Sequence, residues 1–513
     1  MLGILNRRMR RRSFLAAPII AALIWSPFGS AHAAYFQGQT YSAAYDQIVN
    51  FATYGGAPAN SAAANSTAVG AFNTAYAAMS GRTLLIINPG TYNFNSFNIA
   101  NTLGISGSRL TISAYGVTIT AAVGTQGVAV GAGIVQGADN AKETRIDTVS
   151  AGALTVTLKT AGETSRYAVN GWACVGGINM QGAGDPPNQG IFEFKKIQSI
   201  GVGTLTFTEP LENAYQDTWP LYTLGRGGPA TVFPMQGFWD QEVEFQGARF
   251  TDTGNLTYGK PRVMQWTDCL FDTYGPCPTV NNLFRALRCS ANGVGGLEVD
   301  KCINRIEFLD CDIRAIDFQS ASVNHLYVSN HTATNASGVP RWNGGARKSN
   351  TFINLAIGTG GIFRFGPMNY GIMGPTTMTN CSSPSADFFN QTTAFADYTE
   401  VGGGVLSYAG GPGTAASPFH WWATPGGNAV LLDSSNNFAR SFQISDVSQS
   451  GGNTIITTNL PFPLPATING RSAPFKIVAH PCADLTMTGC TGNALFVAQS
   501  LLPAHTPFQN WTL

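Results

Sequence analysis

The chain has 513 residues, enough for more than one domain. Only 11% of the residues are charged, against about 25% in an ordinary globular domain, while 44% are hydrophobic. This composition excludes a disordered chain, which lacks the apolar residues for a core. The formal net charge is +1, but residues 1–33 hold five arginines and no acid, which leaves 24 basic minus 28 acidic residues, or −4, in the remainder. We therefore expect no nucleic-acid partner.

The first 33 residues are typical of an export signal. Arg11 and Arg12 precede an apolar stretch that ends in Ala31, His32 and Ala33. The pattern resembles a bacterial twin-arginine signal cleaved after residue 33, and an ordinary secretory signal with a basic start is the alternative. Either signal predicts a periplasmic or extracellular protein. No later stretch is long and apolar enough to predict a membrane span.

Strand patterns and one short helix follow the signal. Residues 66–79 are predicted to form a helix, and residues 82–94 two strands joined by a Pro89–Gly90 turn. Residues 142–225 contain longer stretches of alternating apolar and polar residues, which predict strands, and the tail from about residue 426 contains a similar sequence pattern. We divide the chain into a signal (1–33), a cap with the first strand repeats (34–141), an inserted β-domain (142–225), the main repeats (226–425) and a C-terminal β-domain (426–513).

Between residues 264 and 380 a short pattern of alternating apolar residues ends repeatedly in Asp or Asn, as in MQWTDCLFD and IEFLDCDIR. The polar position recurs after 42 residues, or twice 21, and then after 20, 24 and 26 residues. A period in the twenties with short strands and polar turns indicates a parallel β-solenoid rather than a leucine-rich repeat. A structural ladder at a tight turn is predicted for Asp268, Asp310, Asn330, Asn354 and Asn380.

The nine cysteines are an odd number for an exported protein. Cys269 and Cys311 share one repeat position, with Cys289 one residue out of phase, which favours a ladder of small buried residues. Cys482 and Cys490 are the candidate disulfide. No C-x-x-C or H-E-x-x-H sequence occurs, so a zinc site is not expected.

An acidic strip is predicted on the strand that precedes two of these repeats. When LEV of GGLEVDKC is aligned with IDF of AIDFQSAS, the apolar residues of both strands are predicted to face the core. Glu298 then lies beside Asp317, and Asp300 beside Gln319, all facing outward on coils about 4.8 Å apart. These carboxylates are either a catalytic cluster or ordinary solvated side chains of an exposed strand.

Basic and aromatic residues follow this strip. Arg341, Arg347, Lys348 and Trp342 lie in the sequence VPRWNGGARKSN, and Arg364 lies between two phenylalanines. On the same surface these cations would neutralise an anionic sugar, and the indole would stack on a sugar ring. An ordinary polar loop is the alternative.

The helix, an I-x-x-P-G-T-Y sequence and the repeats together resemble the pectate-lyase-like superfamily, over about residues 60–135 and 226–410. This superfamily includes polygalacturonases, pectate and alginate lyases, uronan epimerases and tailspike-type depolymerases. The resemblance implies an all-β right-handed parallel β-helix with an N-terminal capping helix, here with two accessory β-domains, and a polysaccharide ligand. The sequences N-T-D, G-H-G, R-I-K, W-I-D-H and D-P-H-E are absent, so no catalytic residue is carried over from these families.

We therefore expect a glycoside hydrolase with Asp300 and Asp317 as the acid/base pair and Glu298 assisting. A polysaccharide lyase or uronan epimerase is the first alternative, with a Lys or Arg base and Ca²⁺ held by the acids. A non-catalytic glycan-binding or cell-surface protein is the second. A hydrolase would need no cofactor. The oligomeric state stays open between a monomer and the homotrimer found among tailspike-type relatives.

Overall fold

The computed structural model describes residues 45–100, 109–121, 128–130, 144–176, 192–218, 230–235, 237–251, 257–259, 261–272, 275–278, 280–291, 296–333, 340–364, 374–384, 386–387, 396–402, 404–409, 428–432, 438–450, 453–459, 467–468, 471–472, 475–479, 485–492 and 511–512. The predicted export signal lies outside these ranges. Among the described residues, no helix is long and apolar enough to cross a membrane.

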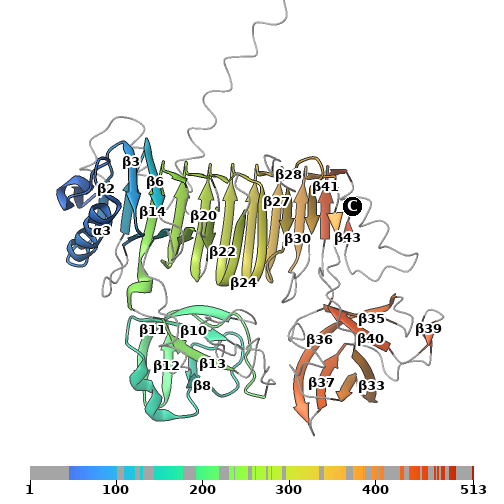
Figure 1. Cartoon of the computed structure of the whole chain (residues 1–513). Coiled ribbons are helices and arrows are strands. Elements are labelled where there is room, and N and C mark those ends of the chain that lie inside the picture. The colour runs from blue at the N-terminus through green and yellow to red at the C-terminus, as the bar shows by residue number, and fades with distance from the viewer. Residues whose placement is uncertain are drawn as a thin grey trace, which may run out of the picture.

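The chain forms a parallel β-helix, in which successive coils stack their strands into three faces (Figure 1). We call these faces A, B and C. Face A consists, in spatial order, of β1 (Gln47–Asn50), β2 (Arg82–Ile86), β5 (Arg109–Ser113), β14 (Glu242–Gln246), β17 (Val263–Thr267), β20 (Asn281–Leu287), β22 (Leu297–Leu309), β24 (Ala315–Ser329), β27 (Ser349–Ile353), β30 (Thr376–Thr379), β41 (Leu485–Thr488) and β43 (Trp511–Thr512).

Faces B and C complete each coil. Face B consists of β3 (Gly90–Phe94), β6 (Val117–Ala121), β15 (Arg249–Thr251), β18 (Leu270–Phe271), β21 (Ser290–Ala291), β23 (Asp312–Ile313), β25 (Thr332–Ala333), β28 (Ala356–Ile357), β31 (Ser382–Ser383) and β42 (Thr491–Gly492). Face C begins with β4 (Phe97–Ile99), β7 (Val128–Val130), β16 (Thr257–Gly259) and β19 (Pro276–Pro278). The N-terminal halves of β22 and β24 continue it, followed by β26 (Arg341–Asn343), β29 (Ile362–Arg364) and β32 (Ala386–Asp387).

One helix covers the N-terminal end of this stack. Helix α3 (Ala62–Tyr76) begins four residues earlier than the predicted 66–79, because the Ser61 side chain caps it by accepting a hydrogen bond from the Ala64 N–H at 3.2 Å. Its Phe72 and Tyr76 are fully buried in the core of the first coils. The helix thereby protects the strand edge that the solenoid would otherwise expose.

Two β-modules interrupt the solenoid. The first is an antiparallel sheet in the order β8 (Thr144–Arg145), β13 (Thr231–Pro234), β10 (Trp172–Gly176), β11 (Phe192–Gly201), β12 (Thr204–Phe207) and β9 (Thr155–Thr157). The second is a closed barrel of β33 (Ala396–Gly402), β34 (Val405–Ala409), β37 (Asn453–Thr458), β36 (Phe438–Ser450), β35 (Asn428–Leu432) and β40 (Phe475–Ala479). Smaller elements are a ribbon of β38 (Thr467–Ile468) and β39 (Arg471–Ser472), and the 3₁₀ helices η2 (Phe51–Tyr54), η4 (Ala161–Arg166) and η5 (Gly237–Asp240).

Both modules replace the corner between face C and face A. The first lies between β7 and β14, and the barrel between β32 and β41. Insertion at the same corner places both on one side of the solenoid (Figure 1). The barrel bounds differ from the predicted 426–513, because the barrel begins at Ala396 and the solenoid returns at β41. Residues 485–490 repeat the strand-and-corner pattern of residues 376–381, beyond the stretch in which the repeat was recognised.

The first module is fixed to the solenoid by an apolar cluster. Phe192 and Phe194 of β11 pack with Trp239, Val280 and Cys302, and the rings of Phe194 and Trp239 are 4.6 Å apart. The burial of these side chains holds the module against the coils that carry the predicted site.

The predicted ladder residues lie in one column at the corner between faces A and B. Asp268, Asp310, Asn330, Asn354 and Asn380 all have φ between 51° and 55°, in the left-handed region that Asn and Asp tolerate. The amide of Asn330 donates to Asp310 at 2.8 Å, and that of Asn354 donates to Asn330 at 2.7 Å. This corner column therefore combines a left-handed backbone with side-chain bonds between coils.

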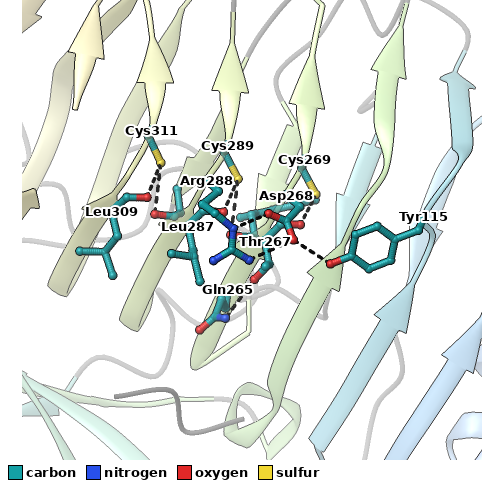
Figure 2. Close-up of polar contacts among 12 residues, drawn as sticks. Tyr115, Gln265, Thr267, Asp268, Cys269, Leu287, Arg288, Cys289, Leu309 and Cys311 are labelled. Atoms are coloured by element: carbon teal, nitrogen blue, oxygen red, sulfur yellow. Dashed lines mark hydrogen bonds and ion pairs between the residues drawn. The ribbon is translucent and has the colours of Figure 1, made fainter. Parts of the chain in front are cut away.

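Arg288 occupies the corner position between Asp268 and Asp310. Its φ is 51°, and its guanidinium pairs with Asp268, which also accepts a bond from Tyr115 at 2.8 Å (Figure 2). Arg288 at the corner puts Cys289 in register with the cysteines above and below it, which corrects the predicted one-residue offset. The three buried thiols lie in a row (Figure 2). The Cys289 thiol also donates to the Trp266 carbonyl of the preceding coil at 3.4 Å.

Replacing Asn330 by alanine tests this corner. Asparagine tolerates the left-handed backbone region, whereas most other L-residues, alanine included, are disfavoured there by about 1–2 kcal/mol. Asn330→Ala should therefore lower the free energy of unfolding by about that amount. Asn330→Gly should cost less, because glycine adopts positive φ freely. Chemical denaturation of both variants measures the difference. Equal losses would mean that the side-chain bonds, and not the backbone, determine the residue at this corner.

Candidate functional site

The predicted acidic strip lies on face C. Glu298 of β22 is in register with Asp317 of β24, which is followed by Asn343 of β26, Arg364 of β29 and Asp387 of β32. We call these five residues the face C column. The apolar neighbours of Glu298 and Asp317 in their strands point into the core, so the two carboxylates face outward as predicted.

Asp300 does not follow the predicted register. A β-bulge between Val299 and Asp300 shifts the pairing, so Asp300 lies opposite Ser320 and not opposite Gln319. The side chain of Asp300 lies outside the described residues, so its role stays a prediction.

Asp317 is not a solvated acid. Its side chain is 4% exposed, and Arg341 Nε donates to its two carboxylate oxygens at 2.8 and 3.0 Å. Arg341 also donates through Nη2, and its own side chain is 46% exposed. A second guanidinium lies nearby: burial, and then the charge of Arg341, lower the pKa of Arg314, while Asp317 raises it. Asp317 is therefore a buried carboxylate whose charge is balanced by arginine.

Trp342 cannot stack on a sugar, contrary to the prediction. It is fully buried, and its Nε1 donates to the Gly344 carbonyl at 3.0 Å. Its ring packs edge-on against Phe308 and Phe352. The reason is strand alternation: Arg341 faces outward, so its neighbour in β26 faces inward.

Two of the remaining predicted cations, Arg347 and Lys348, lie outside the face C column. Lys348 forms an ion pair with Glu212 of the first module, which lowers the pKa of that carboxyl. Lys348 therefore helps to position the module. Burial lowers the pKa of Arg347 to about 10. The backbone of Arg364 is in the column, but its side chain lies outside the described residues.

Two histidines in β24 and its following corner have different surroundings. His325 Nδ1 shares a hydrogen bond with Ser349 Oγ at 2.8 Å, and burial, followed by the charge of Lys348, lowers its pKa. His331 is fully buried and lies 3.3 Å from the Ile313 carbonyl. Among the described residues, no group of three or more His, Cys, Asp and Glu side chains could hold a metal ion.

A row of buried polar residues on face A was not predicted. Glu244, Gln265, Arg285 and Glu307 are in register on β14, β17, β20 and β22. Gln265 donates to Glu244 at 2.9 Å, Arg285 donates to Gln265 at 3.1 Å, and Arg285 pairs with Glu307 at 2.6 Å. The signal was in the sequence, because each residue fills the polar position between the apolar residues of the repeat.

Glu244 is the most perturbed acid in this row. Burial raises its pKa to about 7, against bonds from Gln246, Thr267 and Gln265 that lower it. Its Oε1 accepts from Thr267 at 2.9 Å, and its Oε2 has no hydrogen-bond partner among the residues that the structure describes. A neutral carboxylic acid is favoured here because burial penalises the charged form.

The raised pKa of Glu244 makes stability depend on pH. The folded protein holds the proton more tightly than the unfolded one, so the free energy of unfolding should fall as pH rises from about 4.5 to about 7. The loss amounts to at most about 3 kcal/mol. Glu244→Gln should remove this part of the dependence, which denaturation curves of both proteins at pH 5 and pH 8 would show. Parallel pH profiles would contradict the shift.

No protein-family model matches the sequence, and no curated protein is significantly similar to it. The structure is similar to the tailspike protein gp49 of Pseudomonas phage LKA1, with 15% identity, a TM-score of 0.35 and coverage of 65% of this chain and 59% of that chain. This chain thus spans less than two thirds of that protein.

Two further solved structures are similar. The tailspike gp61 of Pseudomonas phage phi297 has 11% identity and a TM-score of 0.33, over 84% of this chain and 98% of that one. The gp54 tailspike of Acinetobacter baumannii bacteriophage AP22, solved with A. baumannii capsular saccharide, has 9% identity and a TM-score of 0.28, over 84% and 95%. The structure of this chain itself defines its class: an all-β parallel β-helix protein with two β-modules at one corner.

Proposed function

We propose that this chain is an exported polysaccharide-active protein that binds a glycan across face C and hydrolyses it. The observation that carries this proposal is the alignment of Glu298 and Asp317 on neighbouring strands, both facing outward, with the Asn343 backbone next in register. Repeated outward polar groups on parallel coils suit a chain-like ligand, because the ligand and the solenoid are both extended.

The spacing of the two aligned carboxylates supports hydrolysis. Neighbouring strands are about 4.8 Å apart, and retaining glycosidases hold their two carboxyl groups about 5–5.5 Å apart. Asp317, which is held in place by Arg341, suits the role of the nucleophilic carboxylate. Glu298, which is in register with Asp317, and the predicted Asp300 are the two candidates for the proton donor.

A lyase receives less support from the structure. The alternative requires a Lys or Arg base, and Lys348 of the basic loop is paired with Glu212 of the first module. A non-catalytic glycan-binding protein is the second candidate, and the observation that favours it is the engagement of both Asp317 oxygens by Arg341. In that role the exposed face of Arg341 would contact an anionic sugar.

A polysaccharide panel tests the proposal. The mature protein from Ala34 is incubated with neutral and anionic bacterial and plant polysaccharides, with Ca²⁺ or with EDTA, and reducing ends and ultraviolet absorbance are measured together. New reducing ends without absorbance are the expected result. Both signals together would indicate a lyase. Retention of a polysaccharide on the immobilised protein without either signal would identify a binding protein and overturn hydrolysis.

Export is part of the proposal and has its own test. Replacing Arg11 and Arg12 by lysine should leave the full-length precursor in the cytoplasm, because the twin-arginine pair would be lost while the positive charge is kept. Cell fractionation measures this. Normal export of the double variant would point to the ordinary secretory signal.

A further inference from the structure

Two cysteines meet across the barrel insertion. Cys381 follows Asn380 at the corner of the last coil before the barrel, and Cys490 follows Gly489 at the corner of the first coil after it. The flanking residues are in parallel register, Thr379 with Thr488 and Ser382 with Thr491.

The two cysteines therefore lie directly one above the other. The Thr491 N–H donates to the Cys381 carbonyl at 2.8 Å, which fixes the corner of one coil on the other. Parallel neighbours are about 4.8 Å apart, within the range of about 4.4–6.8 Å between the Cα atoms of a disulfide.

The two thiols also contact each other. They are 2% and 9% exposed, and a hydrogen bond between the side chains raises the pKa of Cys381 and lowers that of Cys490. Each sulfur is also near a carbonyl of the neighbouring coil, Cys381 Sγ at 3.6 Å from Phe352 and Cys490 Sγ at 3.7 Å from Met378. The predicted partner of Cys490, Cys482, lies outside the described residues.

We propose that Cys381 and Cys490 form a disulfide in the exported protein, which clamps the coils on either side of the barrel. The Cys490 thiolate attacks a sulfur of an oxidising disulfide, carried by a thiol oxidoreductase or a small molecule, and displaces one thiolate. The Cys381 thiolate then attacks the Cys490 sulfur of this mixed disulfide and displaces the second. Two protein thiols are oxidised, the external disulfide is reduced to two thiols, and their two protons are transferred with them.

The position of the proposed disulfide indicates how it would stabilise the fold. The barrel separates two coils that must pair, so closing the solenoid there joins two cysteines that are 109 positions apart in the sequence. A disulfide restricts the unfolded chain, so folding loses less conformational entropy when the loop between them closes. The stabilisation grows with loop length. The row of Cys269, Cys289 and Cys311 differs, because its neighbours are 20 and 22 residues apart and one thiol would be left over. Opening of the terminal coil would expose both sulfurs to the oxidant.

Peptide mapping of the wild-type protein tests the proposal. The protein is purified from the periplasm or medium without reductant, denatured, alkylated with iodoacetamide and digested. A linked peptide pair containing Cys381 and Cys490, which disappears on reduction, is the expected result. Recovery of both cysteines as alkylated thiols, or a link between Cys482 and Cys490, would overturn the proposal. This measurement does not depend on the folding of a variant or on polysaccharide cleavage.

Thermal denaturation gives a second readout. Dithiothreitol should lower the Tm of the oxidised wild type by about 5 °C or more. It should have little effect on Cys381→Ala, which has lost the bond. The matched control is Cys269→Ala. This substitution removes a buried thiol from the equivalent position of another coil, after the corner residue, and should keep the full sensitivity to reductant. Equal sensitivity of the wild type and Cys381→Ala would contradict the clamp.

Discussion

Asp317→Asn should reduce the rate of polysaccharide cleavage at least about 100-fold, because a positioned carboxyl group contributes about 10²–10⁴ to such a reaction. Asparagine keeps the shape of the side chain and one acceptor for Arg341 Nε, but it cannot carry the negative charge. Arg341 is 46% exposed, so its unpaired charge would remain hydrated and the fold should persist. The measurement is the initial rate of reducing-end release on the polysaccharide that the panel identifies.

Controls separate catalysis from the loss of an ion pair. Asp272→Asn breaks a pair with Arg249 that lies next to face B and should leave the rate unchanged. Arg341→Gln keeps the Asp317 carboxylate and removes its partner, so a purely structural role of the pair would make it as damaging as Asp317→Asn. Glu298→Gln and Asp300→Asn then distinguish the two candidate proton donors. Full activity of Asp317→Asn would exclude this residue from the reaction.

Glu193→Gln should lower the free energy of unfolding of the first module by about 3–5 kcal/mol, the cost of leaving a buried charge without its partner. Glu193 is 4% exposed and accepts from the Glu212 and Asn213 N–H groups at 2.8 Å, from Tyr215 at 2.9 Å and from Lys195 at 3.1 Å. Glutamine would leave the positive charge of the buried Lys195 without a counter-charge. Its side-chain NH2 group would also face the donors that now bond the carboxylate, so these polar groups would lose a hydrogen-bond acceptor.

The effect should be confined to the module. Hydrogen exchange should accelerate in β11 and β12, and the loop that carries Glu212 should loosen from Lys348, while the coils of the solenoid keep their protection. The matched control is Glu163→Gln, which removes a half-buried pair with Arg166 at the module surface and should cost less than about 1 kcal/mol. Uniform destabilisation of module and solenoid would show that the two unfold as one unit.

The period and polarity of the repeats were sufficient to predict the solenoid and its corner. A polar residue that recurs every twenty or so residues marks a turn in each coil, and Asn and Asp are the residues that accept the left-handed backbone found there. The alternation of apolar and polar residues was likewise sufficient to predict that Glu298 and Asp317 face outward. Applied consistently, it would also have predicted that Trp342 faces inward, because Arg341 precedes it.

Tertiary structure decided the rest, because burial and ionic partners depend on residues far apart in the chain. The pairing of Lys348 with Glu212 joins two segments 136 residues apart, and no local pattern predicts it. The bulge before Asp300 arises from pairing between two strands. The stacking of Cys381 on Cys490 depends on the solenoid resuming after the barrel. The sequence by itself thus determined the coil and the direction of its side chains, and the stacking of coils and modules determined which of those side chains are buried, paired or exposed.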